Sequence, residues 1–206
     1  MRVILTRHGE VEGIDPPRFR GRMQLALTDL GRRQAQALAD ALATRYQPAA
    51  VYTSPMQRCR DTAAVIATVC GGSAYVQPGM DDLDYGQWQW KSHEEALREF
   101  PDEFTLWKTA PQWMRFPGGE SLQSVALRIA DAMRDLLQSF EDETIVLVAH
   151  DSVNRVLLTQ ALDLPLSAYW HIGQGPCCIN VLDVYADGRT VVHSVNETAH
   201  LAGLMS

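Results

Sequence analysis

A histidine flanked by an arginine and a glycine, Arg7-His8-Gly9, follows the first apolar run of the chain. Neutral imidazole is a nucleophile, and a guanidinium binds phosphate oxygens through paired, charge-assisted hydrogen bonds. Glycine lets a backbone approach an oxyanion closely. This turn is therefore a candidate anion site, and its histidine is a candidate nucleophile for phosphoryl transfer.

Three further residues of matching chemistry follow along the chain: Arg58, Asp82 and His150. Guanidinium groups close to a histidine lower its pKa through like-charge repulsion, which keeps the imidazole neutral. The same groups neutralise the charge of a transferring phosphoryl group. A carboxylic acid can protonate the departing alkoxide. The set could therefore carry out phosphoryl transfer with neither a metal nor a cofactor.

The elements that must position these residues alternate along the chain. Apolar patterning predicts short strands at residues 2–6, 50–53, 144–149, 179–184 and 191–195. It predicts helices after Thr28 to about residue 46, at 58–69, between 94 and 107, at 122–140 and from about 153 to 162. This order predicts an α/β fold, a three-layer sandwich with a mainly parallel central sheet flanked by helices. Because His8 and His150 both follow strands, we expect them at one edge of this sheet.

Five motifs appear in order along nearly the whole chain. They are Arg7-His8-Gly9, Ser54-Pro55-x-x-Arg58, Asp82-x-x-x-Gly86-x-Trp88, Gly119-Glu120-Ser121 and Val148-Ala149-His150. With these motifs the chain resembles the histidine phosphatase superfamily, in its phosphoglycerate-mutase-like branch (branch 1), from about Arg2 to Val184. The resemblance implies one domain over residues 1–206, with a small cap-like insertion at about 80–117.

The resemblance also implies a role for each matching residue. His8 would be the nucleophile that takes the phosphoryl group. Arg7 and Arg58 would bind phosphate oxygens, with His150 as the second histidine of the phosphate pocket. Asp82 falls where relatives carry a general acid.

The chain departs from the family pattern in the loop after the first motif. Relatives commonly have a phosphate-binding Asn where this sequence has Ile14. Arg18, Arg20 and Arg22 are candidates to replace that contact. An equally good explanation is that these three arginines lie in a solvated loop and form local salt bridges.

Two aspartates compete for the role of proton donor. Asp151 directly follows His150, and a more distant branch of the superfamily uses such a His-Asp pair. Its other interpretation is the N-cap of the following helix. We favour Asp82, because its Gly86-x-Trp88 context matches the closer branch.

Composition limits the possible partners. The 206 residues carry a net charge of −7, which disfavours a broad nucleic-acid surface. No apolar run is long enough to span a membrane, and the four cysteines show neither metal-ligand nor disulfide spacing. We expect a cytoplasmic protein with no metal; a homodimer is compatible with the sequence.

These observations favour a metal-independent phosphomonoesterase that hydrolyses a small phosphorylated metabolite through a phosphohistidine. A cofactor-dependent phosphoglycerate mutase is one alternative, although such relatives tend to be longer and retain the Asn. A catalytically weak member acting in protein recognition is another, and the retained His8, Arg7, Arg58 and His150 argue against it. The substrate stays open.

Overall fold

The computed structural model describes residues 1–140 and 142–204, and this part of the chain contains a six-stranded sheet in the order β3-β2-β4-β1-β5-β6. The strands are β1 (Arg2–Arg7), β2 (Ala50–Thr53), β3 (Ala74–Val76), β4 (Thr144–Ala149), β5 (Ile179–Val184) and β6 (Thr190–Glu197). The first four strands run parallel to one another, whereas β5 and β6 are antiparallel additions at one side. The predicted, mainly parallel sheet is confirmed.

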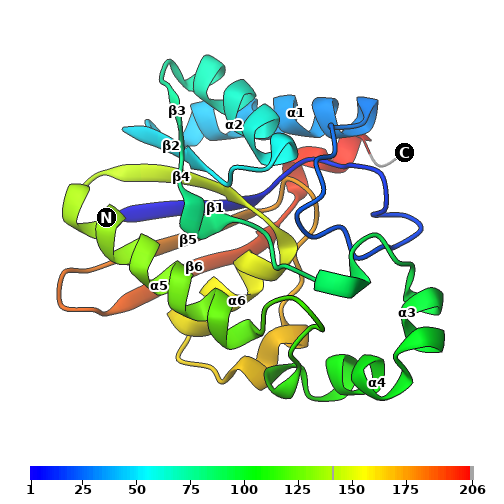
Figure 1. Cartoon of the computed structure of the whole chain (residues 1–206). Coiled ribbons are helices and arrows are strands. Elements are labelled where there is room, and N and C mark those ends of the chain that lie inside the picture. Colours follow the sequence, from blue (N-terminus) through cyan, green and yellow to red (C-terminus); the bar gives the residue numbers. More distant parts are fainter. Residues whose placement is uncertain (141, 205–206) are drawn as a thin grey trace.

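Helices cover both faces of the sheet (Figure 1). Helices α1 (Asp29–Arg45) and α2 (Gln57–Cys70) lie on one face, and α5 (Leu122–Ser139) and α6 (Asp151–Ala161) lie on the other. Successive strand residues point to opposite faces. Ile4 accordingly packs in the core under α1 and α2, while Val3 and Leu5 pack in the core under α5 and α6. The predicted three-layer sandwich is confirmed.

Local signals in the sequence set most of the element boundaries. Thr28 is the N-cap of α1, as predicted, and its hydroxyl accepts a hydrogen bond from the Gly31 amide at 3.0 Å. Helix α6 begins at Asp151, two residues earlier than expected. The sequence did not predict β3, because its three residues are exposed and too few to show a pattern.

The segment of residues 80–117 contains α3 (His93–Glu99) and α4 (Pro101–Thr109). Both helices lie on the side of the molecule where β1 and β4 end (Figure 1). Trp88 anchors this segment, because it is fully buried and packs edge-on against Phe19 of the loop after β1, with ring centroids 5.0 Å apart. The aromatic residues thus fix the segment onto that loop.

Across the residues that the structure describes, no helix combines the length and the apolar character needed to cross a bilayer.

Candidate active site

Two buried histidines lie side by side at the carboxyl end of the sheet. His8 follows β1 and His150 follows β4, and these neighbouring parallel strands pair Arg7 with Ala149 at their ends. The His8 amide donates a hydrogen bond to the Ala149 carbonyl at 3.1 Å, and the two imidazole centroids are 5.3 Å apart. The expected meeting of the two histidines at one sheet edge is confirmed.

The partners of the His8 ring assign its protons. Nδ1 lies 2.7 Å from the Gly9 carbonyl, which can only accept, so Nδ1 carries the hydrogen. Nε2 accepts a hydrogen bond from Nε of Arg58 at 3.2 Å, so it presents a lone pair. Burial, together with Arg58 and Arg7, holds the pKa of His8 well below its ordinary value. The ring is therefore neutral at neutral pH and has a nucleophilic nitrogen.

Arg58 connects this histidine to the rest of the site. Its guanidinium is fully buried, and Nη2 donates to Asp82 Oδ2 at 2.8 Å. The same group donates to the carbonyls of Gly21 at 2.6 Å and Met23 at 2.7 Å, both in the loop after β1. One side chain of α2 thus ties His8, the loop and Asp82 together.

Asp82 is a buried carboxyl group between two partners. Its Oδ2 lies 2.8 Å from Arg58 and 3.4 Å from Nδ1 of His150, while Oδ1 accepts from the Leu83 amide at 2.8 Å. Burial raises the pKa of Asp82, and the charges of Arg58 and Arg20 oppose that rise. A raised pKa keeps the protonated form present to higher pH, as a proton donor requires.

Asp151 has a different environment. It is the first residue of α6, and its carboxylate accepts a hydrogen bond from Nε of Arg155, one turn along the helix, at 2.6 Å. The N-cap residue is His150, which makes no side-chain capping bond, so the predicted N-cap role of Asp151 is wrong. The carboxylate instead pairs with a cation of its own helix.

Arg7 is held from behind by a network of amides. Its Nη1 donates to the Gln174 carbonyl at 2.7 Å, and its buried Nε has no partner among the described residues. The Gln174 side chain bonds Asn180 at 2.7 Å and Asn154 at 3.0 Å. These amides were missed, because nothing in their spacing indicates that they meet.

His150 is likewise held by residues to which the sequence assigned no role. Its Nε2 lies 2.7 Å from the Ser54 hydroxyl and 3.4 Å from Sγ of Cys59. Burial, followed by the charge of Arg58, holds the pKa of His150 well below its ordinary value. Ser54 lies within a recognised motif, but only the fold shows that its hydroxyl reaches this ring.

Two of the three loop arginines are paired with carboxylates. Arg18 lies 3.5 Å from Glu95, which belongs to the segment of residues 80–117. Arg22 lies 3.3 Å from Asp81 and 3.2 Å from Glu120. Their charges are therefore largely compensated within the protein.

Arg20 differs from both of its neighbours. Its Nη1 donates only to the carbonyls of Gly13 and Arg18, and within the described residues it forms no ion pair. Its buried Nε lacks a partner in the same part of the chain. Burial and the like charge of Arg7 lower the pKa of Arg20. Among the described residues, Arg20 is the one of the three candidates that forms no ion pair, although the charge of the Asp82 carboxylate opposes the lowering of its pKa.

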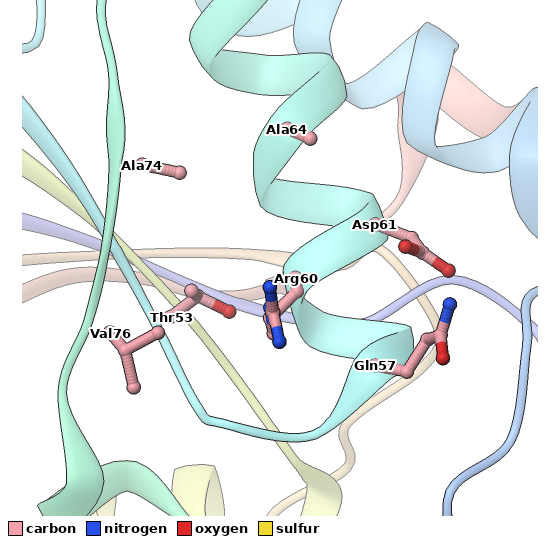
Figure 2. Close-up of a pocket in the computed structure, with 7 residues that line it drawn as sticks. All are labelled: Thr53, Gln57, Arg60, Asp61, Ala64, Ala74 and Val76. Atoms are coloured by element: carbon pink, nitrogen blue, oxygen red, sulfur yellow. The ribbon is translucent and has the colours of Figure 1, made fainter.

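A separate cavity of about 560 Å³ lies between α2 and the strands β2 and β3. Figure 2 shows Arg60 projecting from α2 toward Thr53 of β2 in this cavity. None of the candidate catalytic or phosphate-binding residues lines this cavity. Nor does the described chain contain a group of three or more His, Cys, Asp or Glu residues suited to a metal ion.

The sequence profile of the histidine phosphatase superfamily (branch 1) matches residues 3–198. Phosphoserine phosphatase 1 of Hydrogenobacter thermophilus is 29% identical over 201 residues, covering 98% of this chain and 94% of that protein. A bifunctional protein of Mycobacterium tuberculosis is 31% identical over 200 residues, covering 97% of this chain. The chain spans 55% of the length of that relative, about half.

Solved structures with the same architecture accompany these relatives. Bacillus stearothermophilus YhfR superposes with a TM-score of 0.91 at 26% identity, covering 97% of this chain and 98% of that one. A mycobacterial glucosyl-3-phosphoglycerate phosphatase in complex with VO3 gives 0.87 at 28% identity, covering 96% and 99%. The predicted family and fold class are confirmed by these matches.

Proposed function

This chain belongs to branch 1 of the histidine phosphatase superfamily, and we propose that it is a metal-independent phosphomonoesterase acting on a small phosphorylated metabolite through a phosphohistidine. The observation that carries this proposal is the buried, neutral His8, whose Nε2 lone pair faces the guanidinium of Arg58. Phosphoserine and glucosyl-3-phosphoglycerate phosphatases among the relatives support it.

In the first step, Nε2 of His8 attacks phosphorus, and the bond between phosphorus and the leaving oxygen breaks. Asp82 gives its proton to that oxygen, so the alcohol leaves neutral. The lone pair of His8 is engaged by Arg58 at 3.2 Å in the structure. For His8 to attack, the Nε–H group of Arg58 must release His8 and donate to a phosphate oxygen instead.

In the second step, water attacks phosphorus and the nitrogen–phosphorus bond breaks. The Asp82 carboxylate takes the proton of the water, which regenerates the acid, neutral His8 and free phosphate. Arg7, Arg58 and His150 hold the phosphoryl oxygens in both steps, and the positive charges of the two arginines stabilise the developing charge.

Asp82 suits the acid role better than Asp151. Its raised pKa, which burial causes, favours the protonated form, and it adjoins both Arg58 and His150. The carboxylate of Asp151 is instead occupied by an ion pair with Arg155 of its own helix at 2.6 Å.

The segment of residues 80–117 supplies the cap that meets the leaving group in this proposal. It packs on the loop that follows the nucleophile, and it contributes Asp82 itself. A cytoplasmic location and a homodimer are part of the same proposal, which involves no nucleic acid. A phosphoglycerate mutase is the alternative function. An assay that follows both phosphate release and isomerisation distinguishes the two.

The test is turnover of a panel of phosphorylated metabolites in the presence of a chelator. We expect release of inorganic phosphate and no isomerised phosphoglycerate. Isomerisation without net phosphate release would identify a mutase. Activity that is lost with the chelator and restored by a divalent cation would overturn the metal-independent mechanism.

A further inference from the structure

Asp82 is held through its backbone as well as through its carboxyl group. Its carbonyl accepts hydrogen bonds from two guanidiniums, from Nε of Arg22 at 3.2 Å and from Nη2 of Arg128 at 3.1 Å. Its amide donates to Oδ1 of Asp81 at 2.9 Å, and Oδ2 of Asp81 lies 3.3 Å from Nε of Arg22. Both polar groups of this backbone position are therefore bound by one cluster of charged side chains.

Glu120, of the motif Gly119-Glu120-Ser121, holds this cluster together. Its Oε1 accepts a hydrogen bond from Nε of Arg128 at 3.1 Å, and its Oε2 lies 3.2 Å from Nη2 of Arg22 and 3.2 Å from Nη2 of Arg128. Two guanidiniums that bind the same carbonyl oxygen repel each other, and the carboxylate that they share compensates this repulsion. Without the charge of Glu120, the two arginines would hold the Asp82 carbonyl less firmly.

The same glutamate also binds the chain just after the acid. Its Oε2 accepts a hydrogen bond from the Asp84 amide at 3.0 Å, and its own amide donates to the Asp84 carbonyl at 2.9 Å. Glu120 thus fixes the backbone at Asp84 directly and the backbone at Asp82 through two arginines. These arginines come from the loop after β1 and from α5, so the cluster joins three separate segments of the chain.

The place of the Asp82 carboxyl group follows its backbone closely. Aspartate has one methylene group between Cα and the carboxyl group, so its side chain has few torsions that could correct a shift of the main chain. A general acid must lie within hydrogen-bond reach of the leaving oxygen, and a displacement of about 1 Å can cost about a hundredfold in rate. Groups that hold this backbone therefore affect proton transfer without contacting the substrate.

We propose that Glu120 is a positioning residue that fixes the backbone of Asp82, and with it the proton donor, beside the leaving oxygen. It acts through the two guanidiniums that bind the Asp82 carbonyl. Arg22, a candidate phosphate ligand in the sequence, serves the acid in this arrangement. The inference rests on the proposed phosphatase activity, in which Asp82 is the acid.

The test uses two esters that differ in their need for a proton. One is p-nitrophenyl phosphate, and the other is the fastest alkyl phosphate of the metabolite panel, which includes O-phosphoserine and glycerol 3-phosphate. We expect Glu120→Gln to lower kcat/KM at least about tenfold for the alkyl phosphate and far less for p-nitrophenyl phosphate, because a displaced acid slows the ester that needs it. Added to Asp82→Asn, the same substitution should lower kcat/KM for the alkyl phosphate less than about threefold, since the acid that it positions is already lost.

Asp183→Asn is the matched control. The side chain of Asp183 is 19% exposed, as is that of Glu120, and it accepts two hydrogen bonds from Arg2, at the end of β1 opposite to His8. This variant removes a comparable ion pair and should keep the wild-type ratio of the two kcat/KM values. Equal losses for both esters in Glu120→Gln, or a tenfold loss that persists on top of Asp82→Asn, would overturn the proposal.

Arg128→Lys decides the question should Glu120→Gln fail to fold. Lysine keeps the charge, but its single nitrogen cannot reach the carboxylate and both carbonyls that Arg128 binds. The expected result is again a loss confined mainly to the alkyl phosphate, and equal losses would overturn the proposal. An Asp82→Asn variant that slows both esters equally would instead contradict Asp82 as the acid. Wild-type protein that hydrolyses no ester, p-nitrophenyl phosphate included, would contradict the phosphatase activity itself.

Discussion

The segments that follow β1 and β4 begin alike and then diverge. Each opens with a buried histidine at the same edge of the sheet, and the two rings are 5.3 Å apart. After His8 the chain enters a long loop rich in arginine, whereas after His150 it continues directly into α6. The two histidines therefore share a location but have different surroundings.

The difference lies in which nitrogen is left available. The Gly9 carbonyl accepts the Nδ1 hydrogen of His8. Among the described residues, Nε2 of His8 accepts a hydrogen bond from Arg58 alone, a donor that a phosphate oxygen can take over. Nε2 of His150 is engaged by Ser54 at 2.7 Å, and its Nδ1 faces Asp82. In the proposed mechanism, this hydrogen bonding suits His8 to attack phosphorus and His150 to hold the phosphate.

The largest expected effect comes from exchanging the two histidines for alanine. His8→Ala should lower kcat by at least about a thousandfold, because no other group can form the covalent intermediate. His150→Ala should lower kcat by about a hundredfold, the loss of one stabilising donor. Rapid-quench trapping should give an acid-labile, alkali-stable phosphoenzyme with His150→Ala and none with His8→Ala. A phosphoenzyme that persists in His8→Ala would reverse the assignment.

The two aspartates beside His150 give the next largest effect. Asp82→Asn should slow hydrolysis of alkyl phosphates by about a hundredfold or more, since their alkoxides need a proton. It should slow p-nitrophenyl phosphate far less, because nitrophenolate leaves unaided. Asp151→Asn, the matched control, should change both substrates to a similar, small degree. A leaving-group dependence that appears in Asp151→Asn would transfer the acid role to that residue.

The positions of the two histidines were accessible from sequence because they depend on local patterns. Apolar runs predict the strands, and parallel strands bring their carboxyl ends to one edge, so His8 and His150 had to meet. The amide network of Gln174, Asn154 and Asn180 behind Arg7 was not accessible. It depends on which side chains meet between distant segments, and spacing along the chain carries no such information.

The loop arginines show the same limit. Arg18, Arg20 and Arg22 alternate with other residues and look equivalent in the sequence. Their difference arises from partners in the segment of residues 80–117 and in the loop before α5, such as Glu95 and Glu120. Only the packed structure shows which of the three arginines forms no ion pair with the described residues.

Both histidines should make the protein less stable in mild acid. Their folded pKa values lie well below the unfolded value, mainly because of burial, so the unfolded chain binds more protons once the pH falls below about 6.5. Their contribution is complete above that pH and is lost as the pH falls toward the folded pKa. Each histidine adds up to about 1.4 kcal/mol per pH unit to the slope of the unfolding free energy.

Urea unfolding between pH 7.5 and 5.5 measures this slope. His8→Gln should reduce the slope by the share of one histidine, and His150→Gln should do the same, because both residues are buried. A slope that neither variant changes would show that other groups cause the acid sensitivity.

The smallest effect tests whether Ser54 acts only by holding His150. Its hydroxyl shares a hydrogen bond with Nε2 of His150 at 2.7 Å and accepts one from the Met56 amide at 3.2 Å. Ser54→Ala leaves two buried polar atoms short of a partner, so the free energy of unfolding should fall by about 1–3 kcal/mol. Because His8 and not Ser54 attacks phosphorus in the proposed mechanism, kcat should fall less than tenfold. A fall in kcat as large as that of His150→Ala would mean that the Ser54 hydroxyl itself contacts the phosphoryl group. The difference between the two strand ends would then depend on Ser54 as well as on His8 and His150.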